Sequence, residues 1–260
     1  MSSIFYRKIG KGYPIILLHG FCETHEIWDG LTKDLSKKFE IFTIDLPGFG
    51  NSPPLSTPSS IDEVGAKVFE WIDRQQIQKP VVIGHSLGGY VALAMAKQHP
   101  EDFAGIGLIQ STAFPDTEEK KVNRNKVIEF VKTHGTDPFI DTFVPGLFFD
   151  KSHPAIPQID KIARGTTKET LLAYTALMRD RPSSIDFIKK TNLPVLILGG
   201  DKDTIIPAEI TLEHGKLASN SSLQLLKNIG HMAMYESPLE TQNAIELFMN
   251  RIAPSAHDKF

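Results

Sequence analysis

The chain has 260 residues, a formal net charge of −3 at pH 7 and a hydrophobic residue content of 41%. This length can bury a sizeable core, and the small negative charge gives no reason to expect nucleic acid or an anionic membrane as a partner. A single cysteine, Cys22, excludes an internal disulfide framework and any CxxC metal or redox motif.

Apolar runs and helix-like segments alternate through the first 113 residues. Strands are predicted at residues 4–6, 14–18, 41–44, 81–83 and 105–109, the first of them as a short edge strand. Apolar residues recur at helical spacing between these strands, at Trp28, Leu31, Leu35 and Phe39, at Ile61, Val64, Val68 and Ile72, and in the run 90–97. Strict alternation implies a mostly parallel, doubly wound sheet with helices on both faces and a ligand site beyond the carboxyl ends of its strands.

The alternation lapses between residues 114 and 184, where several helices but no convincing buried strand are predicted. It resumes with strands at 194–198 and 223–226 and helices at 208–217 and 239–251. A helical insertion between two strands of one sheet is typical of a cap over the site. We therefore predict a core of residues 1–113 and 185–260 and a helical cap of residues 114–184.

A serine lies at the joint between the strand at 81–83 and the helix that follows it, in the sequence Gly84-His85-Ser86-Leu87-Gly88-Gly89. A strand that turns at once into a helix packed against it needs neighbours without bulk, which the glycines provide. This is the G-x-S-x-G nucleophile elbow, which raises the Ser86 hydroxyl above the strand ends. It also points the Leu87 N–H toward any oxyanion formed there. An ordinary strand-to-helix turn is the alternative interpretation.

A serine hydroxyl is a poor nucleophile until a base takes its proton, and that base needs an acid to orient it. Asp203 and His231 each follow one of the last two predicted strands, so both are expected at the same edge of the sheet as Ser86. Asp201 competes with Asp203 for the role of acid, with a turn as its alternative role. His85 adjoins the nucleophile but is expected to point elsewhere on the tight turn.

The order Ser, Asp, His along the chain is that of the α/β-hydrolase architecture, and nearly the whole chain resembles that family. The resemblance rests on four motifs, namely His19-Gly20-Phe21, Asp45-Leu46-Pro47-Gly48-Phe49-Gly50, the elbow at Ser86, and the pair Asp203 and His231. It implies an α/β-hydrolase fold with an inserted helical cap. It also implies that the backbone N–H groups of Phe21 and Leu87 are the oxyanion donors and that His19 is structural.

These residues predict a serine hydrolase that cleaves a small to medium ester through an acyl-enzyme, with no metal or organic cofactor. The same catalytic set supports enol-lactone hydrolysis, carbon–carbon bond hydrolysis and cofactor-free perhydrolysis, so it does not choose among them. A receptor that binds its ligand on a hydrolase scaffold is the alternative from another class. Residues 1–8 contain no apolar signal core, and no apolar stretch approaches the roughly 20 residues of a membrane span. We therefore expect a cytoplasmic protein.

The predicted cap is expected to select the substrate. Its apolar residues favour an uncharged acyl or aryl group over a charged one and are Phe139, Phe143, Leu147, Phe148, Phe149 and Met178. Three arginines, Arg164, Arg179 and Arg181, are expected on the solvated helix surface. If one of them faced inward, it would pair with a substrate carboxylate and favour a lactone or carbon–carbon hydrolase of a small carboxylated metabolite.

Overall fold

The computed structural model describes residues 4–55 and 60–253. Residues 1–3, 56–59 and 254–260 of the predicted core, which include the start of the N-terminal segment, lie outside the described residues. Seven strands of the described chain form one sheet in the order β1-β3-β2-β4-β5-β6-β7. They are β1 (Tyr6–Ile9), β2 (Tyr13–Leu18), β3 (Phe39–Ile44), β4 (Val81–His85), β5 (Gly105–Ile109), β6 (Val195–Gly200) and β7 (Ser221–Leu226).

All strand pairs are parallel except β1 with β3, in which Tyr6 lies opposite Ile44. The chain runs from β2 to β3 on one side and then returns to β4 on the other side of β2, where Leu18 pairs with Gly84. In an open parallel sheet the crevice at such a switch point is where ligands bind. The predicted mostly parallel α/β sheet is thus confirmed, and the segments after β2 and β4 meet at this crevice.

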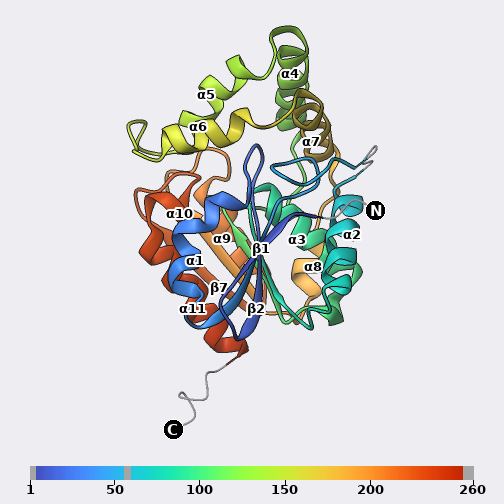
Figure 1. The fold of residues 1–260 in the computed structure, drawn as a ribbon, viewed down its shortest axis with the longest axis vertical. Coiled ribbons are helices and arrows are strands. Elements are labelled where there is room, and N and C mark those ends of the chain that lie inside the picture. Colours follow the sequence, from blue (N-terminus) through green and yellow to red (C-terminus); the bar gives the residue numbers. More distant parts are fainter. Residues whose placement is uncertain (1–3, 56–59, 254–260) are drawn as a thin grey trace.

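Helices cover both faces of the sheet (Figure 1). On one face α1 (Asp29–Leu35) packs against α11 (Pro238–Ile252), and on the other α2 (Ile61–Arg74) packs against α3 (Leu87–Gln98). The apolar stripe predicted for α2 is buried, and the Ser60 hydroxyl caps the helix by accepting from the Glu63 N–H at 3.1 Å. The remaining elements of the core are η1 (His25–Trp28), η2 (Pro100–Asp102), α8 (Ile185–Lys190), α9 (Ala208–Leu217) and α10 (Ala233–Glu236).

The segment between β5 and α8 forms four helices that stand beyond one end of the sheet (Figure 1). They are α4 (Glu118–His134), α5 (Asp137–Leu147), α6 (Ile156–Arg164) and α7 (Lys168–Asp180). α7 is tied to the glycine-rich loop after β3, because the Tyr174 hydroxyl donates to the Pro47 carbonyl at 2.7 Å and the Thr170 hydroxyl to the Gly48 carbonyl at 3.1 Å. Within the described chain, no helix is long and apolar enough to cross a bilayer.

Two of the predicted elements differ from the structure for a clear physical reason. Phe39 was assigned to the helix that contains Leu35, but α1 ends at Leu35 and Phe39 begins β3 opposite Tyr13. The turn between them is three residues long, so Leu35 and Phe39 have the i, i+4 spacing that is also typical of a helix. The edge strand predicted at residues 4–6 begins only at Tyr6, because the Phe5 N–H donates to the Ser52 hydroxyl instead of to a strand.

Candidate active site

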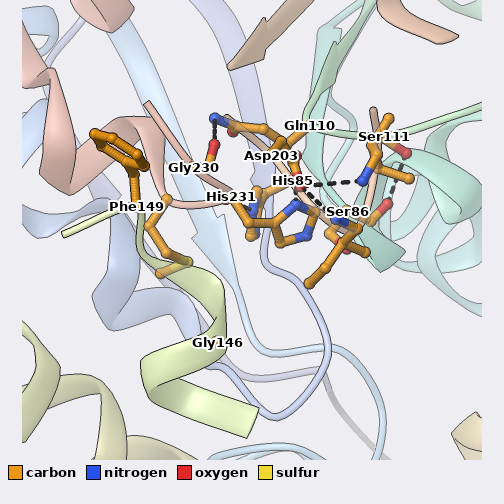
Figure 2. Close-up of polar contacts among 12 residues, drawn as sticks. His85, Ser86, Gln110, Ser111, Gly146, Phe149, Asp203, Gly230 and His231 are labelled. Carbon is orange, nitrogen blue, oxygen red and sulfur yellow. Dashed lines mark hydrogen bonds and ion pairs between the residues drawn. The ribbon is translucent and has the colours of Figure 1, made fainter. Parts of the chain in front are cut away.

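Ser86 lies between β4 and α3 with φ 48° and ψ −113°, a left-handed conformation that strains a residue other than glycine. Its N–H donates to the Ile109 carbonyl at 3.0 Å. Its carbonyl accepts from the Gly89 N–H at 3.0 Å and from the Ser111 hydroxyl at 2.7 Å (Figure 2). β5 and the residues after it therefore hold the strained turn in place.

The close packing of this turn explains its glycines. A Cβ atom at Gly84 would clash with the backbone of Gly88, and one at Gly88 would clash with the carbonyl of Leu18. Glycine at both positions lets α3 begin one residue after Ser86 and lie directly on β2 and β4. The geometry matches the elbow predicted from the sequence.

Asp203 and His231 meet above the carboxyl ends of β6 and β7. His231 Nδ1 lies 2.7 Å from one oxygen of the Asp203 carboxylate, and the other oxygen accepts from the N–H groups of Ile205 and Ile206 at 2.8 and 3.0 Å. Burial would raise the pKa of Asp203, but His231 and these hydrogen bonds outweigh it, so its pKa is lowered. An ionised Asp203 places a proton on Nδ1 and leaves Nε2 of His231 with its lone pair. Asp201 instead accepts from the Asn228 N–H at 2.6 Å, so its carboxylate hydrogen-bonds to the neighbouring loop after β7 and not to its own loop.

Backbone contacts from four directions fix the loop of His231. The His231 N–H donates to the Leu147 carbonyl at the end of α5 at 2.7 Å, and its carbonyl accepts from His85 Nε2 at 2.8 Å. The Gly230 carbonyl accepts from Gln110 at 3.2 Å (Figure 2), and the Gly230 N–H donates to Glu236 at 3.0 Å. The bond to Leu147 ties this loop directly to the inserted helices.

The backbone N–H groups of Phe21 and Leu87 have no hydrogen-bond acceptor among residues 4–55 and 60–253. Leu87 is the first residue of α3, so its N–H has no partner within the helix. Phe21 follows β2, next to the strand that carries Ser86. The structure thus leaves both predicted oxyanion donors open.

Glu23 and His85 form a buried pair that sequence analysis did not predict. The pair supports the loop that contains Phe21 and the loop that contains His231. One carboxylate oxygen of Glu23 accepts from the Gly20 N–H at 2.6 Å and lies 2.9 Å from His85 Nδ1. Because His85 Nε2 also faces an acceptor, the carbonyl of His231, both ring nitrogens must carry hydrogen, and the ring is an imidazolium. Burial would lower the pKa of His85, but the Glu23 carboxylate outweighs it and raises that pKa. Both ring nitrogens of His85 are thus engaged by Glu23 and by the His231 carbonyl, and neither bonds to Ser86.

His19 has a structural position, as the resemblance implied. Its Nε2 accepts from the Leu46 N–H at 2.9 Å, so its Nδ1 carries the hydrogen that faces the Gly20 carbonyl at 2.7 Å. Burial lowers the pKa of His19, which is consistent with a neutral ring. His19 therefore joins the loop after β2 to the loop after β3.

Ser86 and His231 line one small cavity between the sheet and the inserted helices. The other lining residues are Phe21, Glu23, His85, Tyr90, Arg124, Phe143, Leu147, Met178 and Ile205. The cavity volume is about 40 Å³, room for roughly three water molecules. Lining side chains or the inserted helices must therefore move before a molecule of substrate size can enter.

Three of the six apolar residues predicted to contact the substrate, Phe143, Leu147 and Met178, line this cavity. Phe149 does not, since 47% of its surface is exposed and its ring points away from Ser86 (Figure 2). Phe139 stacks on Phe143, with ring centroids 5.0 Å apart. The apolar wall expected of this region is therefore present, but only in part.

None of the three arginines named from the sequence lines the cavity. Arg164 pairs with Asp160 and Asp141, and Arg179 pairs with its neighbour Asp180, as expected for solvated helix surfaces. The expectation was wrong for Arg181, which is only 7% exposed.

A fourth arginine, Arg124 on α4, lines the cavity instead. Sequence reasoning missed it because α4 is polar on nearly all sides, and only the fold of the inserted helices shows which of its charges faces inward. Glu23 was missed for a similar reason, since its loop has no periodic pattern. In the described part of the chain, no group of three His, Cys, Asp or Glu side chains is arranged to hold a metal ion.

Comparison with known proteins shows the fold family of the chain. The family model described as "alpha/beta hydrolase fold" matches residues 13–238. The uncharacterized hydrolase YugF of Bacillus subtilis is 26% identical over 90% of this chain and 88% of its own length. A 2-hydroxy-6-oxo-6-(2'-aminophenyl)hexa-2,4-dienoic acid hydrolase of Metapseudomonas resinovorans is 24% identical over 95% of this chain and 88% of its own.

A solved structure of a thermophilic esterase from Thermogutta terrifontis, with malate bound, superposes with a TM-score of 0.90 at 27% identity. The superposition covers 96% of this chain and 93% of that one. The family match spans most of the chain, including the segments after β2, β4 and β6 and the loop of His231. The chain therefore belongs to the α/β-hydrolase fold family.

Proposed function

We propose that this hydrolase cleaves a small to medium carboxylic ester through a covalent acyl-enzyme on Ser86. The observation that carries the proposal is the shared cavity of Ser86 and His231, together with the 2.7 Å contact of His231 with Asp203. A strained elbow serine, a histidine with a free Nε2 and a buried carboxylate are the parts that acyl transfer by serine needs.

In the first step, Nε2 of His231 takes the proton of the Ser86 hydroxyl as the oxygen attacks the ester carbonyl. The proton then passes from His231 to the departing alcohol as the ester bond breaks. Asp203 keeps the other ring proton on Nδ1 and stabilises the imidazolium that forms in between. In the second step His231 takes a proton from a water molecule as that water attacks the acyl group, and it returns the proton to the Ser86 oxygen as the acid leaves.

The tetrahedral oxyanion of each step accepts hydrogen bonds from the N–H groups of Phe21 and Leu87. Each such donor contributes about 10²–10³ in rate. The Glu23 bond to the Gly20 N–H supports this arrangement because it holds the backbone immediately before Phe21. The bond from His85 Nε2 to the His231 carbonyl holds the loop of His231 in the same way.

The cap that selects the substrate is proposed to be residues 114–184, inserted into a core of residues 1–113 and 185–260. Three observations support it: α4–α7 stand beyond the sheet end that carries Ser86, α5 and α7 contribute Phe143, Leu147 and Met178 to the cavity, and the backbone of Leu147 bonds to that of His231. Movement of this cap relative to the core is the simplest route for substrate entry.

Hydrolysis of an enol-lactone or of a carbon–carbon bond in a small carboxylated metabolite is the second candidate. Arg124 favours it because a guanidinium in the cavity suits an acid-bearing substrate. The name of the Metapseudomonas resinovorans relative describes a hydrolase of a dienoic acid. A ligand receptor on a hydrolase scaffold is distinguished from both candidates by slow turnover and tight retention of its ligand.

A panel of p-nitrophenyl esters of increasing acyl length, assayed beside aliphatic lactones, tests the proposal. We expect turnover of the short and medium esters by the wild type and none above background by Ser86→Ala. Turnover of lactones alone would favour the second candidate. Rapid ester turnover by Ser86→Ala would refute the assigned nucleophile.

A further inference from the structure

We propose that Arg124 forms a carboxylate subsite, so that the preferred substrate carries an acid group as well as the bond that is cleaved. The inference rests on the proposed function, because it names the substrate class of the same cavity. Among the residues that line this cavity, Arg124 is the only one with a permanent positive charge. It belongs to α4 and so reaches the cavity from the cap side.

The guanidinium of Arg124 is only partly engaged. Its Nε donates to one oxygen of Asp116 at 3.1 Å, which fixes the side chain, while neither of its terminal nitrogens has a hydrogen-bond partner in the described part of the chain. The side chain is 25% exposed. A planar fork that is oriented by one carboxylate and still has free donors is suited to bind a second carboxylate with two hydrogen bonds.

The single negative charge of Asp116 does not balance Arg124 fully, because Asp116 also pairs with Arg181. The Arg181 Nη1 donates to the other Asp116 oxygen at 2.7 Å, and the two side chains are 5% and 1% exposed. Nη1 of Arg181 also donates to the Met178 carbonyl and Nη2 donates to the Phe114 carbonyl, and the guanidinium lies 4.0 Å from the ring centre of Tyr90. Arg181 is thus held by Asp116, two carbonyls and a ring face, and one carboxylate serves two guanidinium groups.

Lys120 adds a third cation to this cluster. Its Nζ donates to the Ile205 carbonyl at 3.1 Å, and Ile205 itself lines the cavity. Burial lowers the pKa of Lys120, and the charges of Arg181 and Arg124 act in the same direction, while Asp116 and Asp203 act against it. Asp116 is the carboxylate of the cap that opposes these three cations, so the cap side of the cavity has an excess of positive charge.

The opposite wall does not cancel this excess. Glu23 also lines the cavity, but its carboxylate is paired with the imidazolium of His85 at 2.9 Å. Asp203 keeps its negative charge beside a neutral His231, but it is buried and does not line the cavity. An acid group that enters the cavity therefore meets one partly free guanidinium and one neutralised carboxylate, that of Glu23. The remaining wall of Phe21, Phe143 and other apolar side chains would make an unpaired carboxylate costly, so the pairing with Arg124 decides whether an anion binds.

Matched pairs of esters test this subsite. One pair places the charge on the acyl side, as mono-p-nitrophenyl glutarate against p-nitrophenyl butyrate, and the other places it on the leaving group, as 4-acetoxybenzoate against phenyl acetate. The wild type is compared with Arg124→Gln, which keeps donors but removes the charge. Arg164→Gln is the matched control, since Arg164 lies in the same cap but does not line the cavity.

We expect the wild type to prefer the anionic ester of at least one pair about tenfold in kcat/KM. Arg124→Gln should lower kcat/KM for the anionic ester about 10- to 100-fold, as loss of a charge-assisted hydrogen bond does. It should change kcat/KM for the neutral ester less than about threefold. Arg164→Gln should change neither ester. An equal loss on both esters, or a preference for neutral esters that Arg124→Gln leaves unchanged, would overturn the subsite.

A binding measurement separates the subsite from the proposed function. If no ester is turned over, the proposed function fails, and calorimetric titration of glutarate into Ser86→Ala still tests Arg124. Binding that is lost in the double variant Ser86→Ala with Arg124→Gln would support the subsite. Absence of glutarate binding to Ser86→Ala, or equal binding by both proteins, would overturn it.

Discussion

Replacement of Glu23 by Gln tests the buried ion pair beneath the predicted oxyanion loop. The substitution keeps the size of the side chain and an acceptor for the Gly20 N–H, but it removes the charge that holds His85 as an imidazolium. Both side chains of the pair are buried, at 2% and 1% exposure. Removing one partner of such a pair costs about 3–5 kcal/mol, because the other is left buried without its counter-charge.

The expected change in melting temperature follows from the size of the chain. With an unfolding entropy of about 2 cal/mol/K per residue and 260 residues, a loss of that size lowers Tm by roughly 5–10 °C. Glu26→Gln is the matched control, since Glu26 is half-buried in the same region and does not contact His85. It should lower Tm by less than about 2 °C.

The stability difference between wild type and Glu23→Gln should also depend on pH. Burial would raise the pKa of Glu23, but His85 outweighs it and lowers that pKa, so the carboxylate contributes above about pH 4.5 and its contribution is lost as the pH falls through the lowered value. The pKa of His85 is raised, so the imidazolium contributes fully below about pH 6.5 and its contribution is lost as the pH rises through the raised value.

The largest difference in stability is therefore expected between about pH 4.5 and 6.5, with a decrease on both sides. Thermal melts of the wild type and both variants, recorded at half-unit steps from pH 4 to 9, measure it. Equal Tm values for Glu23→Gln and wild type, or a difference independent of pH, would refute the charged state assigned to His85.

Three further substitutions give sharp expectations. Asp203→Asn should fold normally but lose about 10⁴ in kcat, because an amide favours the wrong tautomer of His231, and a loss below tenfold in an ester assay would contradict the role of Asp203. Arg181→Ala should lower the free energy of unfolding in urea by about 1.5–3 kcal/mol, because it removes a hydrogen bond to the buried, charged Asp116, which keeps Arg124 as its partner, whereas Arg179→Ala should lower it by less than about 1 kcal/mol. Gly84→Ala should yield little folded protein, since its Cβ would clash with backbone, and a wild-type circular dichroism melt would contradict the packing of the elbow.

The features that the sequence predicted well are those with a local cause. The strands β4 and β5 are short apolar runs, and β4 leads into a glycine-rich turn in which a Cβ atom at Gly84 would clash with the backbone of Gly88, four residues along the chain. Asp203 and His231 were predicted to lie together because each follows a strand whose end had to lie at the edge of the sheet, and His231 Nδ1 lies 2.7 Å from the Asp203 carboxylate. Their role beside Ser86 stays a prediction.

The features that were missed depend on contacts between distant segments. Glu23 and His85 are 62 residues apart in the sequence. They become partners only because β2 and β4 are neighbours in the sheet. Arg124 faces the cavity only because α4 packs against α7 and brings one side of a polar helix over the strand ends. Phe39 was placed in a helix because spacing alone cannot distinguish a short turn from one more helical turn. Such features need the tertiary structure.

The assignment of Ser86 as the nucleophile is the central claim, and covalent labelling tests it most directly. The wild type is incubated with a fluorophosphonate, digested, and the modified peptide is sequenced by mass spectrometry, with Ser86→Ala in parallel. We expect one phosphonate on Ser86 in the wild type, complete loss of ester hydrolysis upon labelling, and no label in Ser86→Ala. A phosphonate on any other serine, or hydrolysis that survives full labelling of Ser86, would contradict this assignment.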